Sequence, residues 1–317
     1  MRPWTDAGFR RIRAGAGFRY ADRRGRAPSA EDRRRIDGLV IPPAWTDVWI
    51  SADPAGHIQA TGVDGAGRTQ YLYHPQWTAH RDRGKFARAL ALAEALPQAR
   101  GRVTTALRGD DLGRERVLAA SFRLLDTVAV RVGSERYLVR HGSRGLTTLR
   151  RRDALVEGST VRLRFVGKSG RLQQLELDDD DLAVVVALLA QGRPRAALLA
   201  YEQGRRRIAL TPREVNAHVR LLTGGRFSAK DFRTLRGTIL AAEALARLGP
   251  PDAGVSATQL RRAEALAVRA VADALGNTPA VARGSYIDPR VFVRYRRGQV
   301  LDRRISPESA IRALLTG

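Results

Sequence analysis

The sequence contains no cysteine and little histidine, and these two shortages exclude several kinds of chemistry. Without cysteine the chain has no disulfide bond, no thiolate metal ligand and no cysteine nucleophile. Its five histidines are His57, His74, His80, His141 and His218, and no two of them have the spacing of a metal-binding pair. We therefore expect no metal site, and we expect neither a zinc enzyme nor a redox enzyme.

Long apolar runs are also missing. No stretch approaches the roughly 20 uncharged apolar residues that a transmembrane helix needs, and residues 1–6 lack the apolar core of a signal peptide. The glycine-rich pattern of a nucleotide-binding P-loop is absent as well. These absences predict a cytoplasmic protein without a membrane partner, a nucleotide cofactor or any other cofactor.

Positive charge is the most unusual property that the chain does have. Lys and Arg number 56 against 32 for Asp and Glu, which gives a formal net charge of +24. Such an excess indicates a polyanionic partner, most simply nucleic acid, with an acidic membrane surface as the weaker alternative. Only Lys85, Lys168 and Lys230 are lysines. A lysine kept in so arginine-rich a chain is a candidate proton donor, because a guanidinium does not release its proton.

Composition changes along the chain and predicts two domains. Of the 317 residues, 44% are hydrophobic, which is ordinary for a globular protein. Up to Phe86 the sequence is rich in short strand patterns and aromatic residues, and after it Ala, Leu and Arg recur at helical spacing. Strands are expected over residues 48–51, 57–62 and 69–73. The predicted domains are residues 1–86 and 87–317.

The second domain is predicted to be mainly helical, with a small antiparallel sheet. Alternation in 161–165, a glycine-flanked turn at 167–170 and a return over 172–177 indicate a hairpin. Ser256 and Gln259 form a plausible capping box for a long helix that ends at Gly276, and Thr278-Pro279 resembles the start of a helix carrying Tyr286. The predicted fold class is α+β.

Four segments of the second domain carry residues suited to phosphoryl transfer without a metal. That chemistry needs a nucleophile, cations to neutralise the phosphorane oxygens and a proton for the leaving oxygen. The segments are Val130–Gly133, Phe165–Lys168, Lys230–Thr234 and Gly276–Tyr286. Taken singly, each has an ordinary structural explanation, such as a snorkelling arginine, a turn lysine, a solvated helix face or a half-buried aromatic.

Taken together, the segments resemble a known family. The ordered set Arg131, Lys168, Arg233, Asn277 and Tyr286 resembles the active site of type IB DNA topoisomerases of the small poxvirus and bacterial branch. Segments 41–50, 56–62 and 67–74 are similar to the bacterial members, so the resemblance covers nearly the whole chain. It implies an enzyme that nicks one strand of duplex DNA, lets supercoils relax and religates, on the catalytic fold shared with tyrosine recombinases.

The resemblance implies a role for each of the five residues. Tyr286 is the expected nucleophile, forming a 3′-phosphotyrosyl link, and Arg131 and Arg233 are expected to contact the non-bridging oxygens. Asn277 stands where many relatives have histidine and is expected to donate a hydrogen bond to phosphate. Lys168 is the expected general acid for the 5′-oxygen, since a lysine pKa starts near ~10.4 and can fall, whereas arginine stays protonated.

The resemblance also implies how DNA is held. The first domain is expected to clamp the duplex, and Gln70, Tyr71 and Tyr73 are its candidate DNA contacts, with the tyrosines facing one way along a strand and Gln70 the other. Lys230 and Tyr137 are candidate contacts in the second domain. The expected partner is double-stranded DNA, bound by a monomer associated with the nucleoid and acting without ATP.

Two other functions remain open from the sequence. A tyrosine recombinase shares the catalytic logic, but recombinases usually carry His-x-x-Arg where this chain has Lys230-Asp231-Phe232-Arg233, and they lack a comparable first domain. A non-catalytic basic DNA-binding protein explains the charge equally well. It gives no reason for Tyr286, Lys168 and two arginines to occur in this order.

Overall fold

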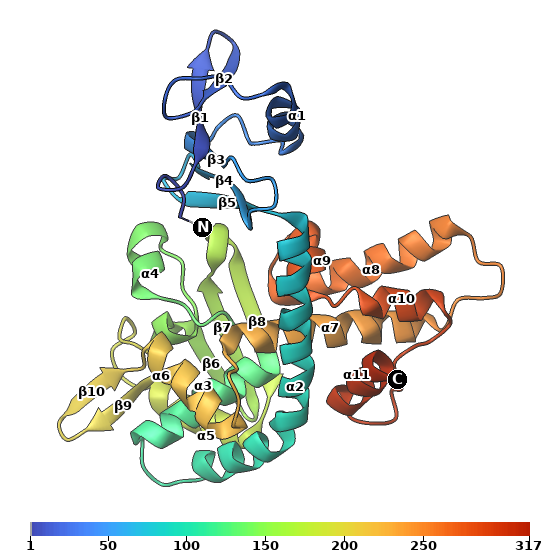
Figure 1. The fold of residues 1–317 in the computed structure, drawn as a ribbon. Helices are drawn as coiled ribbons and strands as arrows, with labels where there is room; N and C mark the ends of the chain where they lie inside the picture. The colour runs from blue at the N-terminus through green and yellow to red at the C-terminus, as the bar shows by residue number, and fades with distance from the viewer. Residues whose placement is uncertain (1) are drawn as a thin grey trace. The chain divides into compact units, whose positions relative to one another are not determined.

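The computed structural model describes residues 2–317, with Ala79 described by its backbone alone. The chain forms two compact units, one up to Gly84 and one from Lys85 onwards (Figure 1). Both helix and antiparallel sheet are present, which confirms the predicted mixed class. In the described part of the chain no helix is long and apolar enough to cross a membrane.

The first unit is built on one antiparallel sheet. Its strands are β1 (Gly8–Ala14), β2 (Gly17–Ala21), β3 (Thr46–Ser51), β4 (Ile58–Val63) and β5 (Thr69–Tyr73), in the order β2-β1-β3-β4-β5. Helix α1 (Ala30–Gly38) begins at Ser29, whose side chain accepts from the Asp32 amide. Ile36 of α1 packs with Phe9, Val48 and Ile50 in a small separate core. The three predicted strands are all found.

Helix α2 (Pro75–Leu107) is continuous across the division between the units. It begins directly after β5, so the change in composition after Phe86 falls inside a helix and not at its start. The part of α2 that belongs to the second unit buries Leu92, Leu96 and Val103 on one face. Its apolar face therefore belongs to the core of the second unit.

The second unit combines helices with two small sheets. Its helices are α3 (Arg114–Val128), α4 (Glu135–His141), α5 (Asp180–Ala190), α6 (Pro212–Thr223), α7 (Ala229–Leu248), α8 (Ala257–Leu275), α9 (Pro279–Tyr286), α10 (Arg290–Arg296) and α11 (Pro307–Thr316). Strands β6 (Ala154–Glu157), β7 (Thr160–Val166) and β8 (Leu172–Asp178) form one antiparallel sheet, and β9 (Ala200–Gln203) pairs with β10 (Arg206–Ala209). The predicted hairpin is β7–β8, with the 3₁₀ turn Lys168–Gly170 between the strands.

Helix ends in this unit follow the predicted capping signals. The Ser256 side chain accepts from the Gln259 amide while Gln259 bonds back to Ser256, which confirms the capping box of α8. Gly276 ends α8 in the left-handed conformation, and Thr278 caps α9 with Pro279 as its first residue. The two caps set the short connection between α8 and α9 (Figure 1).

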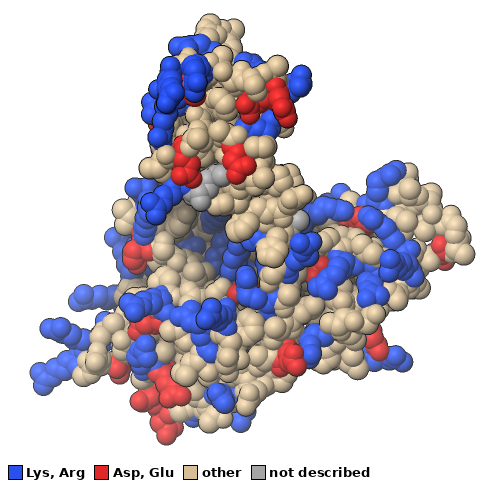
Figure 2. Space-filling model, viewed as in Figure 1, with Lys and Arg blue, Asp and Glu red and all other residues tan. Residues whose placement is uncertain are grey.

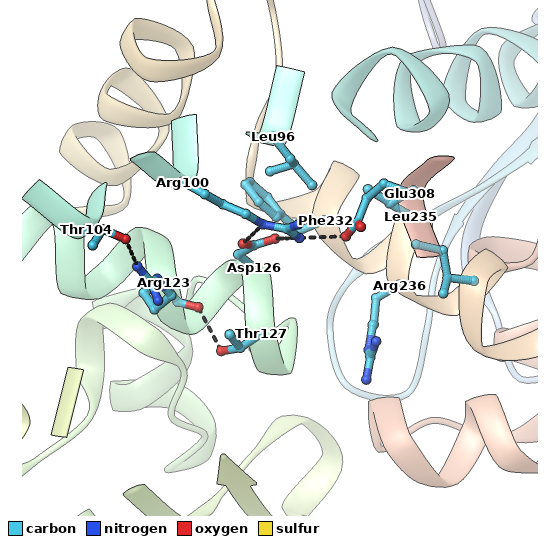
Figure 3. Close-up of a pocket in the computed structure, with 11 residues that line it drawn as sticks. Leu96, Arg100, Thr104, Arg123, Asp126, Thr127, Phe232, Leu235, Arg236 and Glu308 are labelled. Carbon is cyan, nitrogen blue, oxygen red and sulfur yellow. Dashed lines mark hydrogen bonds and ion pairs between the residues drawn. The ribbon is translucent and has the colours of Figure 1, made fainter. Parts of the chain in front are cut away.

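One apolar core and a charged network hold the helices of this unit together. The rings of Phe122 in α3 and Phe232 in α7 meet edge to face, 5.3 Å between centroids. Beside them lies a cavity of about 390 Å³ (Figure 3), where Arg100 of α2 contacts Asp126 at 2.7 Å and Glu308 of α11 at 2.6 Å. These contacts fix α2, α3, α7 and α11 against one another.

We expect Phe122→Ala to lower the free energy of unfolding of the second unit by about 3–5 kcal/mol, because it removes a ring that is 1% exposed and leaves a cavity against Phe232. Chemical denaturation followed by circular dichroism measures the change. Leu221→Ala, at a residue 73% exposed on α6, is the matched control and should cost no more than about 0.5 kcal/mol. Equal losses for the two variants would contradict this account of the core.

Candidate active site

Arg131 lies in a tightly packed loop after α3. The helix ends at Val128, and Ala129 turns the chain in the left-handed conformation at φ 48°. Arg131 therefore lies outside the helix, three residues after its end. The Arg131 carbonyl accepts from the Leu146 amide at 2.8 Å, and a Cβ on Gly145 would lie 2.5 Å from that same oxygen. This close packing fixes where the Arg131 side chain starts.

Arg233 is a buried arginine on the second turn of α7. Its Nη1 donates to the Ala129 carbonyl at 2.6 Å and its Nη2 to the Leu275 carbonyl at 2.8 Å. The guanidinium thus satisfies carbonyls at the ends of α3 and α8, and its Nε is buried without a hydrogen-bond partner among the described residues. The alternative explanation, a solvated basic helix face, is wrong for Arg233, which is 5% exposed.

Helix α7 begins just before Arg233 with a reciprocal cap. The amide of Ser228 donates to Asp231 Oδ2 at 2.9 Å and its hydroxyl donates to the same oxygen at 2.8 Å, so the Asp231 carboxylate caps the start of the helix. Arg88 of α2 also contacts the Asp231 carboxylate, at 3.4 Å. The start of α7, and with it Arg233, is therefore fixed by charged contacts.

Asn277 lies in the connection between α8 and α9 and faces Arg131. Its Oδ1 accepts a short hydrogen bond from Arg131 Nη2, which also reaches the Gly276 carbonyl at 3.4 Å. The residue is buried, and its Nδ2 has no hydrogen-bond partner in the described chain. Because an unpaired buried amide donor is costly, this group is poised to donate to a ligand. Gly276, and not Asn277, takes the left-handed conformation.

Tyr286 is the last residue of α9, and its ring lies against Arg233. The guanidinium carbon of Arg233 is 4.9 Å from the centroid of the ring. The backbone is held by Thr238, whose Oγ1 donates to the Tyr286 carbonyl at 3.2 Å. At Gly237 a Cβ would lie 2.7 Å from that carbonyl oxygen, so only glycine allows α7 and α9 to approach this closely. The phenol is therefore placed by two helices.

Lys168 completes the group from the tip of the β7–β8 hairpin. It follows Gly167 and precedes Ser169, which is strained at φ 62°. With Arg131 and Arg233 it lines a small pocket, and its charge acts on the Tyr286 phenol. Lys168 is exposed, not buried. Five residues that are far apart in the sequence thus converge on one place.

The charges of this cluster act on one another. Burial alone would raise the pKa of Tyr286, but the charge of Arg233, its hydrogen bond to the phenol and the charges of Arg131 and Lys168 outweigh burial and lower that pKa below its ordinary value of 10. Burial, together with the nearby charge of Arg233, lowers the pKa of Arg131 to about 10. The site therefore favours negative charge, both on the phenol and on a ligand.

Arg171 also belongs to the site, although the sequence analysis did not select it. Its Nη1 donates to the Asn277 carbonyl at 2.9 Å, and its charge contributes to the lowered pKa of Arg131. It lies three residues after Lys168 on the same hairpin tip. The sequence did contain a signal for Arg171, because it follows the candidate acid Lys168 closely in the same glycine-containing turn.

In the first unit, Tyr71 and Tyr73 share one face of β5, as predicted. Their rings stack with centroids 5.9 Å apart, and Tyr71 is 44% exposed. Gln70 belongs to the other face, where its Nε2 donates to Asp64 Oδ2 at 2.7 Å. Tyr71 is therefore a surface residue and not part of the core.

The two remaining candidate contacts are exposed on the second unit. Tyr137 is 54% exposed on α4, with its ring 6.1 Å from that of His141. Lys230 is exposed at the start of α7, whereas Arg233 one turn later is buried, so the pair does not share a single solvated face. On the face seen in Figure 2, Lys and Arg side chains are spread over both units.

The arrangement suits transfer of a phosphoryl group to an oxygen nucleophile. It offers a phenol with a lowered pKa, three adjacent cationic side chains and a free buried amide donor. Among residues 2–317 no group of three or more His, Asp or Glu side chains could hold a metal ion. The cationic groups that the site offers to a phosphate are the guanidinium groups of Arg131 and Arg233 and the ammonium group of Lys168.

Comparison with known proteins identifies relatives of both parts of the chain. A family model of the catalytic core of eukaryotic DNA topoisomerase I matches residues 74–293, more than half of the chain. A model of the N-terminal domain of bacterial DNA topoisomerase IB matches residues 17–64. DNA topoisomerase 1B of Acanthamoeba polyphaga mimivirus is 26% identical over 288 residues, which is 86% of this chain and 86% of that protein.

We expect the Tyr286 phenol to ionise below pH 10, because cations surround it. The absorbance of phenolate, taken as the difference between the protein and its Tyr286→Phe variant across a pH titration, measures the midpoint. Arg131→Gln removes one cation, destabilises the phenolate and should move the midpoint upward towards the ordinary value. Arg19→Gln on β2 of the first unit is the control and should leave it unchanged. A wild-type midpoint at or above 10 would contradict the geometry described.

Proposed function

The chain belongs to the type IB DNA topoisomerase family and is a DNA isomerase, and we propose that Tyr286 is the nucleophile with which it nicks duplex DNA. The observation that carries the proposal is the placing of this phenol against Arg233, within the field of Arg131 and Lys168. A site that lowers the pKa of a tyrosine is suited to use that tyrosine as an attacking oxygen.

Cleavage is a transesterification in which atoms and charge balance. The Tyr286 oxygen gives its proton to water and attacks phosphorus, the bond from phosphorus to the 5′-oxygen breaks, and a 3′-phosphotyrosyl link results. The leaving 5′-oxygen takes a proton from Lys168 to become a hydroxyl, and Lys168 regains a proton from solvent. Arg131 and Arg233 stabilise the negative charge that develops on the non-bridging oxygens. Asn277 adds the free Nδ2 donor, which the buried amide supplies without any proton transfer.

Lys168 is the residue we assign to protonate the 5′-oxygen as it leaves. Its exposed position on a hairpin tip lets the ammonium group reach a ligand that covers the pocket lined by Arg131 and Arg233. Asn277 cannot act as an acid, and arginine keeps its proton. Since Tyr286 is assigned as the nucleophile, Lys168 is the remaining side chain of the cluster that can give a proton to the 5′-oxygen.

Relaxation follows from the covalent link. The phosphotyrosyl bond conserves the energy of the phosphodiester, so religation by the reverse reaction needs no ATP. While the strand is open the free 5′ end rotates and torsional strain is released.

We assign the first unit to clamping the duplex, with Gln70, Tyr71 and Tyr73 as DNA contacts, and Lys230 and Tyr137 as contacts of the second unit. The enzyme acts as a monomer in the nucleoid.

The proposed nucleophile is tested by relaxation of supercoiled plasmid in EDTA. Wild-type protein should relax the plasmid, and Tyr286→Phe should be inactive, since phenylalanine has no attacking oxygen, while binding DNA with an unchanged Kd. Tyr201→Phe, on β9 of the second unit and outside the proposed site, is the matched control and should retain relaxation. Equal activity of wild type and Tyr286→Phe would refute the assignment.

The same assay separates the alternative functions. A tyrosine recombinase would need a specific site and a multimer for strand exchange, and a non-catalytic binding protein would leave the plasmid supercoiled. Binding should weaken with salt at a log–log slope of about −0.9 for each phosphate neutralised. Relaxation by the monomer on plasmid without a recombination site supports the assignment.

The proposed acid is tested with Lys168→Ala. We expect single-turnover cleavage to slow by about 10²–10⁴-fold with unchanged DNA binding, because the 5′-oxygen then leaves without a proton. A 5′-phosphorothiolate substrate, whose sulfur leaves without protonation, should restore much of the rate. Tyr286→Phe should stay inactive on both substrates. If the sulfur substrate does not rescue Lys168→Ala, this lysine is not the acid.

A further inference from the structure

Glu264 is a buried carboxylate in the middle of α8 that binds two arginines. The residue is 2% exposed. Its Oε2 accepts from Arg283 Nη2 of α9 at 2.9 Å, and its Oε1 accepts from Arg296 Nε of α10 at 2.7 Å. One carboxylate therefore joins three helices, and both arginine side chains are about half exposed at 49%.

Helix α9 depends on such contacts for its orientation. It has only eight residues, fewer than an isolated helix needs to be stable in water. Arg283 lies three residues before Tyr286, almost one turn, so the Glu264 contact is made on the turn that presents the phenol. Arg283 also stacks on Phe292 of α10, 4.6 Å from the ring centroid. The side chain is held from two directions.

The stability of the fold alone does not explain why Glu264 is a buried carboxylate. Desolvating a charge is costly, and a buried ion pair often contributes no more stability than well-packed apolar residues would. What the arrangement does supply is a fixed distance and direction between α8 and α9. The same helix α8 offers the Leu275 carbonyl to Arg233. Helix α8 therefore positions the Arg233 guanidinium through Leu275 and the Tyr286 phenol through Glu264 and Arg283.

We propose that Glu264 is a positioning residue for the reaction, which holds α9 through Arg283 so that the Tyr286 oxygen meets the phosphate bound by Arg131 and Arg233. This inference rests on the proposed role of Tyr286. Since a displacement of about 1 Å can slow a reaction by about 10²-fold, loss of the contact should reduce the rate of cleavage and leave DNA affinity unchanged.

The test is single-turnover cleavage of a duplex substrate at saturating enzyme, together with the Kd for DNA. Glu264→Gln should lower the rate constant by about 10–100-fold with a Kd within about twofold of wild type. The rate constant separates positioning from simple destabilisation, which lowers the fraction of enzyme that reacts and not the rate of that fraction. Glu308→Gln is the matched control: it also breaks an arginine contact of a largely buried carboxylate, away from α9, and should cleave at the wild-type rate.

A second variant shows whether Glu264 acts through Arg283, and serves if Glu264→Gln does not fold. Arg283→Gln should slow cleavage to a similar degree, and the double variant should be no slower than either single one, because both remove the same contact. A wild-type rate in Glu264→Gln, multiplying effects in the double variant, or an equal loss in Glu308→Gln would each overturn the proposal.

The same series distinguishes failure of this inference from failure of the proposed function. If Tyr286→Phe cleaves DNA, the role of Tyr286 is wrong and the inference falls with it. If Tyr286→Phe is inactive and Glu264→Gln cleaves at the wild-type rate, only the inference is wrong. Fluorine NMR of protein labelled with 3-fluorotyrosine gives an independent readout: the Tyr286 resonance, assigned by its loss in Tyr286→Phe, should shift or broaden in Glu264→Gln and stay unchanged in Glu308→Gln.

Discussion

The buried guanidinium of Arg233 is the contact on which the site depends. It donates to the carbonyl of Ala129 after α3 and to that of Leu275 at the end of α8, and the ring of Tyr286 lies against it. Helix ends leave carbonyls without partners inside the helix, so a cation between two of them satisfies both ends and fixes their separation. The same group therefore joins two helix ends and places a positive charge against the Tyr286 ring.

Three residues around this guanidinium are placed by different local features of the backbone. Arg131 is placed by a left-handed Ala129 and by the close approach of Gly145, Asn277 by the left-handed Gly276, and Tyr286 by the end of a short helix packed on Gly237. At each of these positions a helix ends and the backbone turns in a defined direction, which fixes where the next side chain points. Lys168, by contrast, is exposed at the tip of the β7–β8 hairpin, after the buried Gly167 and before the left-handed Ser169.

Local signals predicted much of the fold, and long-range contacts account for what they missed. The capping pair Ser256 and Gln259, Gly276 and the 161–177 hairpin could be predicted because their physical causes lie within a few residues. The five site residues came from a family resemblance, since nothing local shows that Arg131 and Asn277 would touch. The burial of Arg233, the carbonyl contact of Arg171 and the pairing of Glu264 with Arg283 and Arg296 depend on other helices, and no spacing in the sequence encodes them.

The cations of the cluster repel one another, and a bound phosphate anion would offset that repulsion. Bringing Arg131, Arg233 and Lys168 together opposes their own charges, and the pKa of Arg131 falls to about 10 as a result of burial and of Arg233. A phosphate between these groups replaces repulsion by attraction, and the unpaired Asn277 amide gains an acceptor. In the mechanism proposed here, the cations that face the phosphate are side chains of the fold itself.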